Sequence, residues 1–228
     1  LLTTLLCICS LGFSQVSLQV ISVDSSSEYL SNFELKTEFA TQNQARRAVT
    51  SIFPKLISAG YISASLDYWK CDSINCAAAV YIGNCYKWAK LSKGSVDEYA
   101  LSQAGFRDKI YNNKVLSQKQ LGQLFENLIG YYENNGYPFA SIQLDSIEIN
   151  EESISAQLNL QKNQTTTIDS VSIIGTAKIS PIYMHNYLDI KPGGMYNELN
   201  ISRISTRLTE LPFVKQKQPF EVLFTNEY

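Results

Sequence analysis

The sequence predicts an α+β fold built from tandem β-α-α-β-β modules, each with a small sheet that carries two helices on one face. The first observation behind this prediction is an ungapped internal repeat. The stretch "KLISAGYISASLDYW", which begins at Lys55, matches "YYENNGYPFASIQLD", which begins at Tyr131, 76 residues later. The second observation is that the spacing of apolar residues changes inside each copy, from a helical period to alternation. A module of roughly 75 residues can bury one small core between a sheet and two helices.

The two copies open with the same predicted helix. Thr41 and Ser117 each stand three residues before a glutamine, Gln44 or Gln120, and this spacing is typical of a capping box at a helix N-terminus. Apolar residues then recur at helical spacing: Ala45, Ala48, Val49 and Ile52, and Leu121, Leu124, Phe125 and Leu128. Each helix is therefore expected to bury one face.

Both helices are expected to end at a glycine and to lead into a strand. Pro54 and Gly130 weaken the helices at the same offset, and Gly60 and Gly136 stand where a helix ends in a left-handed residue. The following apolar residues alternate with polar ones, as in a strand with one buried face. They are Ile62, Ala64, Leu66 and Tyr68, and Ala140, Ile142 and Leu144.

The remaining elements complete two modules. A second strand, at residues 74–82 or 154–160, closes a hairpin with the strand before it. A candidate strand and a shorter helix precede each long helix. In the first copy these are "LQVISVD" (18–24) and "SEYLSNF" (27–33), and in the second "CYKWAKL" (85–91) and "VDEYALSQAG" (96–105).

A third copy is predicted near the C-terminus. Asn197 can cap a helix whose apolar residues follow at the offsets seen before, and Pro212 indicates where this helix stops. "IDSVSIIG" (168–175) is the candidate opening strand, "SPIYMHNYL" (180–188) the short helix and "FEVLF" (220–224) the second strand.

The N-terminus and the cysteines favour export. Residues 1–13 are apolar and uncharged, as in the core of a signal peptide, although a buried amphipathic helix is the alternative. In an exported protein Cys71 and Cys76, which flank a predicted turn, can form a disulfide. Two free buried thiols are the other interpretation. Zinc is disfavoured because three thiols and one distant histidine make a poor site.

The order and spacing of these elements resemble POTRA domains, the periplasmic modules of BamA- and TamA-type outer-membrane proteins. The resemblance rests on "YYENNGYPFASIQLDSIEI", "IDSVSIIGTAKIS" and "AGYISASLDYW", and on Gly175, Gly194, Tyr196 and Asn197 in the third copy. It implies three-stranded mixed sheets in which the final strand lies between the other two. It also implies that these modules bind unfolded outer-membrane proteins or accessory periplasmic proteins.

From the apolar N-terminus we expect a truncated signal peptide at residues 1–14. From the repeat and the resemblance we expect modules at residues 15–83, 84–166 and 167–228. The third module is expected to lack its last strand and to be poorly closed. We therefore expect a fragment of a longer chain from the bacterial outer membrane, with a downstream β-barrel that anchors it and modules that face the periplasm.

The expected function is binding by β-augmentation, in which an extended client adds to a sheet edge. The likeliest edges are Tyr61–Lys70 and Phe139–Ile149, with Ser63, Ser65 and Asp67, and Ser141, Gln143 and Asp145, as candidate residues. Near Asp145 and Ser146 the second strand changes phase, as at a bulge. Shielding of these edges by neighbouring modules is the alternative. Other functions kept open are a dedicated two-partner secretion transporter, lipoprotein assembly, and a periplasmic or cell-division scaffold without a barrel.

The sequence does not favour an enzyme, a cofactor, a metal or a nucleic acid. Its net charge of −2 gives no basic footprint for nucleic acids. The single histidine, His185, has no nucleophile in a recognised turn beside it. Glu151 and Glu152 are expected at a hairpin tip, and "KPGG" (191–194) is expected to form a turn rather than a phosphate loop.

Overall fold

The fold is taken from a computed structural model that describes residues 15–24, 30 and 33–225. The chain divides into two compact units, one of Leu1–Ala89, Tyr111–Lys119 and Ile149–Ile154, the other of Lys90–Ile110, Gln120–Glu148 and Ser155–Tyr228. This division into units does not test the expected module boundaries, which remain a prediction. The expected signal peptide and most of the first short helix (27–33) lie outside the described residues.

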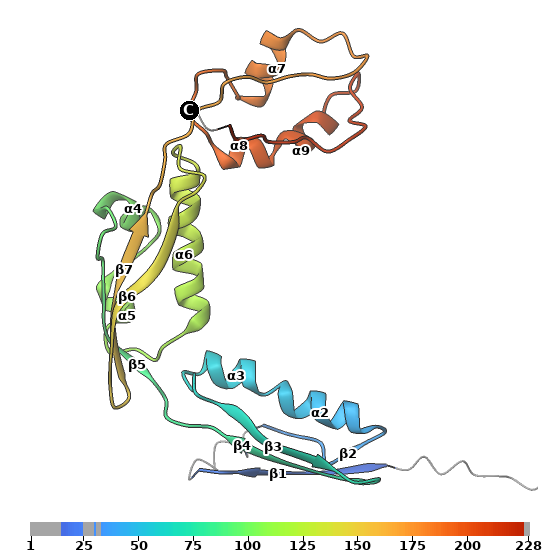
Figure 1. Cartoon of the computed structure of the whole chain (residues 1–228), viewed down its shortest axis with the longest axis vertical. Coiled ribbons are helices and arrows are strands. Elements are labelled where there is room, and N and C mark those ends of the chain that lie inside the picture. The colour runs from blue at the N-terminus through green and yellow to red at the C-terminus, as the bar shows by residue number, and fades with distance from the viewer. Residues whose placement is uncertain (1–14, 25–29, 31–32, 226–228) are drawn as a thin grey trace, which may run out of the picture. The chain divides into compact units, whose positions relative to one another are not determined.

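The first sheet has the strand order β2-β1-β4-β3 and is mixed (Figure 1). Its strands are β1 (Val16–Ser22), β2 (Glu38–Phe39), β3 (Ser65–Cys71) and β4 (Asn75–Tyr81). β1 is parallel to β4, whereas β3 and β2 are antiparallel to their neighbours. The strand that closes the hairpin thus lies between the other two long strands, as expected, and the short β2 is an addition that the sequence did not predict.

Two helices replace the single long helix expected over the first sheet. They are α2 (Gln42–Thr50) and α3 (Phe53–Ser58), and Pro54 lies in the first turn of α3. Proline cannot donate an intrahelical hydrogen bond but fits a first turn, so the helix restarts ahead of Pro54. At the start of α2 the Thr41 hydroxyl accepts a hydrogen bond from the Gln44 amide at 3.2 Å, and the Gln44 side chain accepts one from the Ala40 amide.

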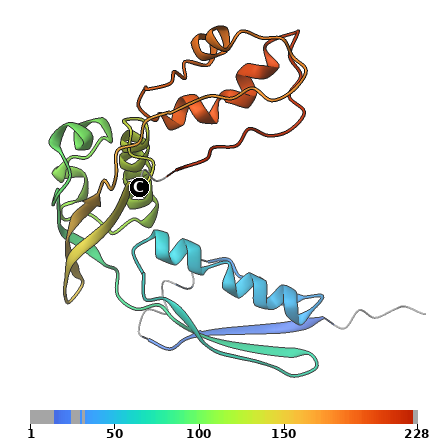
Figure 2. The ribbon, with the colours of Figure 1, turned by 45° about the horizontal axis from the view of Figure 1, so that its top comes forward.

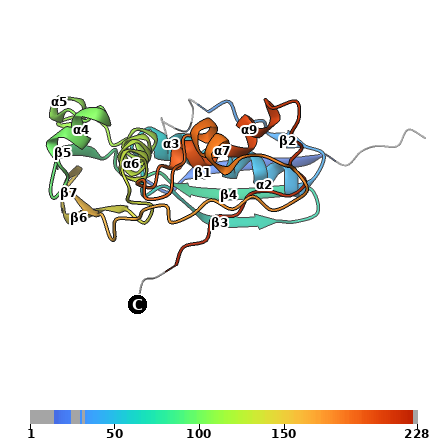
Figure 3. The ribbon, with the colours of Figure 1, turned by 90° about the horizontal axis from the view of Figure 1, so that it is seen from above.

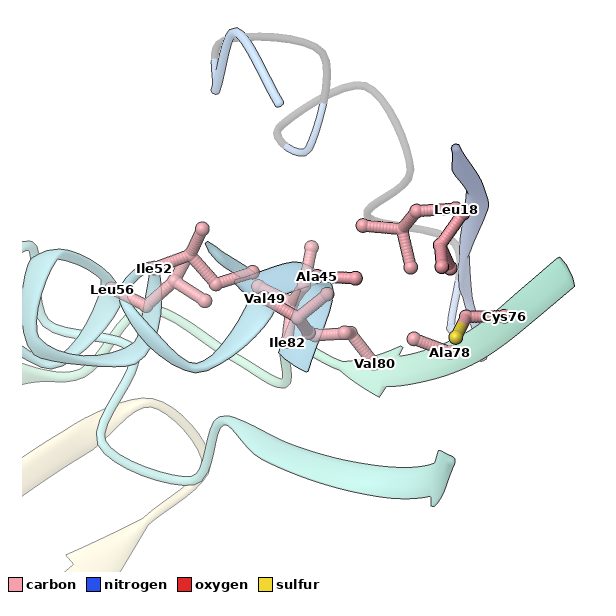
Figure 4. Close-up of a cluster of buried hydrophobic side chains, with 10 residues drawn as sticks. Leu18, Ala45, Val49, Ile52, Leu56, Cys76, Ala78, Val80 and Ile82 are labelled. Carbon is pink, nitrogen blue, oxygen red and sulfur yellow. The ribbon is translucent and has the colours of Figure 1, made fainter. Parts of the chain in front are cut away.

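The core of the first sheet lies between these helices and β1 and β4 (Figure 4). Val49, Leu56 and Val80 are fully buried, and Ile52 is 2% exposed. The apolar stripe predicted for the helix faces the sheet, since these side chains meet those of β4. Burial of each aliphatic side chain of this kind contributes about 1.5–3 kcal/mol.

The second sheet has the order β5-β7-β6, again with the hairpin-closing strand in the middle. Its strands are β5 (Lys87–Ser92), β6 (Ser141–Asn150) and β7 (Ser153–Gln161), and its helices are α4 (Glu98–Gln103), α5 (Asp108–Tyr111) and α6 (Gln118–Glu133). α6 is continuous through Gly130, because glycine weakens a helix without removing a backbone donor. Leu124, Leu128 and Tyr132 form its buried face.

A hydrogen-bonded cluster joins the ends of α4, α6 and β7. Tyr132 donates from its hydroxyl to the Asp97 carboxylate at 3.0 Å, and the Lys162 ammonium donates to the same carboxylate at 2.7 Å. These hydrogen bonds, with Lys162 the larger cause, lower the pKa of Asp97. Tyr131 and Tyr137 pack edge-on against Tyr132, with ring centroids 5.2 and 6.1 Å away. Tyr131, Tyr132 and Tyr137, in the second copy of the repeat, therefore pack together at the junction between helix and strand.

The C-terminal part of the chain contains α7 (Pro181–Leu188), α8 (Glu198–Ser202) and α9 (Ile204–Thr209) around a small core. Asn197 caps α8 by accepting a hydrogen bond from the Asn200 amide at 3.0 Å. The strands expected at 168–175 and 220–224 are not formed among the described residues, where these segments extend without strand pairing (Figure 2). In these segments Ile174 is 97% exposed and Leu223 is 82% exposed.

The turn after the long helix has the same hydrogen bonds in both repeats. Gly60 and Gly136 are left-handed, with φ of 95° and 90°. The Tyr61 amide donates to the Leu56 oxygen at 3.0 Å, and the Tyr137 amide donates to the Tyr132 oxygen at 3.0 Å. These are the closing bonds of a helix that ends in a left-handed glycine. The predicted role of both glycines is confirmed.

Each glycine also begins a chain of two backbone hydrogen bonds, which we call the Gly60 clasp (Gly60, Tyr86, Leu116) and the Gly136 clasp (Gly136, Thr166, Tyr196). In the first, Tyr86 donates to the Gly60 oxygen at 2.9 Å and Leu116 donates to the Tyr86 oxygen at 2.9 Å. In the second, the corresponding distances are 2.8 and 3.0 Å. The segment after each hairpin is thus tied both to the preceding turn and to the residues ahead of the next long helix.

Candidate partner-binding strand edges

One edge of each sheet is covered by the chain itself. In the first sheet β2 pairs with β1, and the Leu18 amide donates to the Thr37 oxygen. In the second sheet the segment ahead of α6 lies along β5, where Trp88 donates to the Lys114 oxygen and accepts from the Asn113 amide. These contacts satisfy backbone groups that an edge strand would otherwise expose.

The opposite edges are formed by β3 and β6, each the last strand in the order of its sheet (both labelled in Figure 3). Among the residues that the structure describes, no strand pairs with the outer side of either. Each therefore offers a row of unpaired backbone donors and acceptors to another extended chain.

The β3 edge is interrupted early. Its pairing with β4 shifts register between Leu66 and Tyr68, which leaves Asp67 at the irregularity. The Asp67 carboxylate accepts a hydrogen bond from the Ser65 hydroxyl at 2.6 Å, so both side chains are engaged locally. The regular part that remains is Tyr68 to Cys71.

The β6 edge is longer and changes direction at Ser146. Ser146 has φ of 49°, a left-handed conformation that occurs at bulges. Its amide donates to the Asp145 carboxylate at 2.6 Å, and its hydroxyl accepts from the Gln157 side chain on β7 at 2.6 Å. The predicted phase change at this position is therefore present as a local backbone feature, and it divides β6 into two four-residue halves, 141–144 and 147–150.

The six candidate residues lie in different places: five are on strands and one is in a turn. Ser141, Gln143 and Asp145 are exposed on β6 and alternate with half-buried neighbours, as expected for a strand with one covered face. Ser65 and Asp67 lie on β3, as predicted. Ser63 does not: it lies in the turn before β3, close to Gly83, because the strand begins at Ser65 and not at Tyr61 as expected.

The predicted edge Phe139–Ile149 includes most of the second half of β6, but the sequence did not predict that its isoleucines are exposed. Ile147 is 54% exposed and Ile149 is 59% exposed, although isoleucine is usually buried. The signal available in the sequence was their change of parity after Ser146. Whether this change returns them to the core depends on how far the core extends, which periodicity alone does not indicate.

Cys71 and Cys76 form a disulfide across the β3–β4 hairpin, with Cα atoms 4.1 Å apart. The two residues are direct cross-strand partners. In the turn between them the Asp72 carboxylate accepts hydrogen bonds from the amides of Asn75 and Ile74, which lower the Asp72 pKa in that order of importance. Cys85 is the free cysteine among the described residues.

Of the residues considered for catalysis, His185 lies on a different element of the described structure from Glu151 and Glu152. His185 is half-buried on α7, and its Nε2 atom is buried without a hydrogen-bond partner. Glu151 and Glu152 occupy the tip of the β6–β7 hairpin, as predicted. Within the described part of the chain, no cluster of three or more His, Cys, Asp or Glu side chains could hold a metal ion. None of the helices described there is long and apolar enough to cross a membrane.

A solved structure with the same fold consists of POTRA domains. Over 87% of both chains, the structure resembles POTRA domains 3–5 of BamA from Haemophilus influenzae, with a TM-score of 0.54 and 14% identity. Weaker similarities are to the N-terminal domain of Omp85 from Thermosynechococcus elongatus (TM-score 0.38, 11% identity, 86% of each chain) and to POTRA domains 1–3 of Omp85 from Anabaena (0.39, 11%, 86% of this chain and 83% of that one). No family model and no curated protein sequence matches the chain. The chain has the POTRA fold, which the sequence patterns predicted.

Proposed function

We propose that this chain, which has the POTRA fold, binds extended segments of other proteins at the free edges of its sheets, in the periplasm and as part of an outer-membrane assembly or secretion protein. The observation that carries the proposal is the asymmetry of the second sheet. Its own chain covers β5, whereas the ten-residue β6 is left open. A partner that adds to β6 would extend the sheet through backbone hydrogen bonds.

Binding through the backbone suits a receptor for many unfolded clients. Backbone donors and acceptors are the same in every sequence, so affinity would come from the strand shape and selectivity from side chains at alternate positions. The role is a non-enzymatic one. β6 is the preferred site because its two halves together are longer than the regular part of β3.

Site-specific photocrosslinking tests the proposal. A photoreactive residue at Gln143, exposed on β6, is expected to capture an unfolded outer-membrane protein and not the same protein after folding. The matched control places the residue at Glu126, which is exposed on α6. Equal capture at both positions, or capture at Glu126 alone, would show that clients do not use the strand edge.

A further inference from the structure

The second half of β6, residues 147–150, combines exposed isoleucines with nearby acidic side chains. Between Phe139 and Gln161, the β6–β7 hairpin carries four acidic side chains and no lysine or arginine: Asp145, Glu148, Glu151 and Glu152. The rest of the chain carries 17 acidic and 19 basic residues, so the charge of −4 on this hairpin exceeds the net charge of −2 of the whole chain. Among the described residues, none of these four carboxylates takes part in an ion pair.

Apolar and acidic groups alternate along this half-strand. Successive side chains of a strand point to opposite faces, so Ile147 and Ile149 share one face and Glu148 lies on the other. A strand added beside them would meet apolar side chains on the first face and a carboxylate on the second. The best complement is therefore a strand that alternates apolar and basic residues.

The same charges act against pairing between two copies of this chain. Two β6 strands placed edge to edge would bring their acidic hairpins together, and like charges directly opposite each other destabilise a strand pair. Acidic side chains on an edge strand are one way in which proteins suppress self-association. The occupant must then be a different chain, and its charge must be positive.

We propose, on the basis of the function proposed above, that Ile147–Asn150 is the client-selective half of β6 and takes extended segments of unfolded proteins in which apolar residues alternate with lysine or arginine. Ser146, with its left-handed backbone, marks the boundary of this half. The carboxylates of Glu148, Glu151 and Glu152 select the client, and the backbone of β6 holds it.

Four peptides of eight residues test this proposal with the full chain. Each has valine at alternate positions, with lysine, glutamine or glutamate between; the fourth is the lysine peptide with N-methylated valines, which lacks backbone donors along one edge. Binding is measured by fluorescence anisotropy at low and at high salt. The lysine peptide is expected to bind most tightly and the glutamate peptide most weakly, with the difference reduced at high salt. N-methylation is expected to abolish binding.

Variants that replace glutamate by glutamine test which carboxylates attract the lysine peptide. E148Q is expected to weaken lysine-peptide binding roughly two- to fivefold, the range measured for cross-strand charge pairs, and the triple variant E148Q/E151Q/E152Q about tenfold. Binding of the glutamine peptide should stay the same. The matched control E126Q, at an exposed position of α6, should change neither, and circular dichroism checks that each variant is folded.

The outcomes distinguish the two proposals. If all three charged and neutral peptides bind equally and only N-methylation removes binding, β-augmentation stands and the charge selection is wrong. If the N-methylated lysine peptide still binds, the attraction is not strand pairing and the inference is overturned. If no peptide binds, the proposed function at β6 fails together with the inference. Dimerisation through β6, detected by sedimentation and lost in a β6 variant, would also overturn it.

Discussion

The Gly136 carbonyl accepts a hydrogen bond from the Thr166 amide at 2.8 Å, as the Gly60 carbonyl does from Tyr86 at 2.9 Å. Both glycines are left-handed, and a Cβ atom at Gly136 would lie 2.7 Å from Cε of Met195. The glycines thus do two things, since they end a helix and hold the segment that follows the hairpin.

Gly136→Ala is expected to lower the free energy of unfolding by about 1–2 kcal/mol, the cost of a left-handed conformation for a residue with a Cβ atom. The measurement is urea unfolding. Gly130→Ala is the control: Gly130 is inside α6 with open space around it, so alanine there should raise stability by about 0.5–1 kcal/mol. Equal effects at the two positions would contradict the role of Gly136.

Ile52 and Leu128 occupy equivalent positions in the repeat and are almost fully buried. I52A and L128A are each expected to cost about 2–5 kcal/mol, because each leaves a cavity in a packed core. Hydrogen exchange should show increased opening of β1 and β4 in the first variant and of β5 and β7 in the second. If each variant loosened both sheets equally, the chain would not consist of separately folded repeats.

The stability of the second sheet is expected to depend on pH through Asp97. Its pKa is lowered in the folded chain, so its stabilising effect is present above the ordinary aspartate pKa of about 3.9 and is lost as the pH falls through the folded pKa. Asp97→Asn is expected to lose less stability between pH 5 and pH 2 than the parent, as measured by thermal unfolding across that range. Asparagine can still accept from Tyr132, so the comparison isolates the charge. An unchanged acid profile would be evidence against the ion pair with Lys162.

The Cys71–Cys76 disulfide encloses a short turn. By loop-closure entropy its removal in the variant C71S/C76S is expected to cost about 2 kcal/mol, with the largest increase in hydrogen exchange at the β3–β4 tip. Cys85→Ser, which breaks no disulfide, is the control. Alkylation without reductant followed by mass spectrometry should label Cys85 and leave the pair unlabelled. Labelling of all three would show that the bond does not form.

The sequence predicted those parts of the fold that depend on local residue chemistry. The capping residue Thr41, the terminating glycines and the hairpin order follow from spacing and backbone conformation, and they are found where expected. The break between α2 and α3 was predicted only as a weak point, because proline can either kink a helix or start a new one. β2, α5 and the segment along β5 were missed, since they are held by contacts distant in sequence.

The candidate site was predictable as strands but not as an edge with two halves. Alternation identified Ser141, Gln143 and Asp145, whereas the exposure of Ile147 and Ile149 depends on where the covering helix ends. Similarly, residues 168–175 have a strand-like pattern, but a strand needs a partner, and none is formed in the described chain. An alternating residue pattern indicates that a segment can form a strand. The segment becomes a strand only when it pairs with another one.

Isotope-edited nuclear Overhauser spectroscopy tests the central claim most directly. An unlabelled client peptide is bound to the labelled chain, and contacts between peptide backbone protons and those of the protein are recorded. The proposal predicts a ladder of cross-strand contacts to β6, concentrated at Ile147–Asn150. Contacts confined to the helices, or to exposed side chains without any backbone ladder, would contradict it.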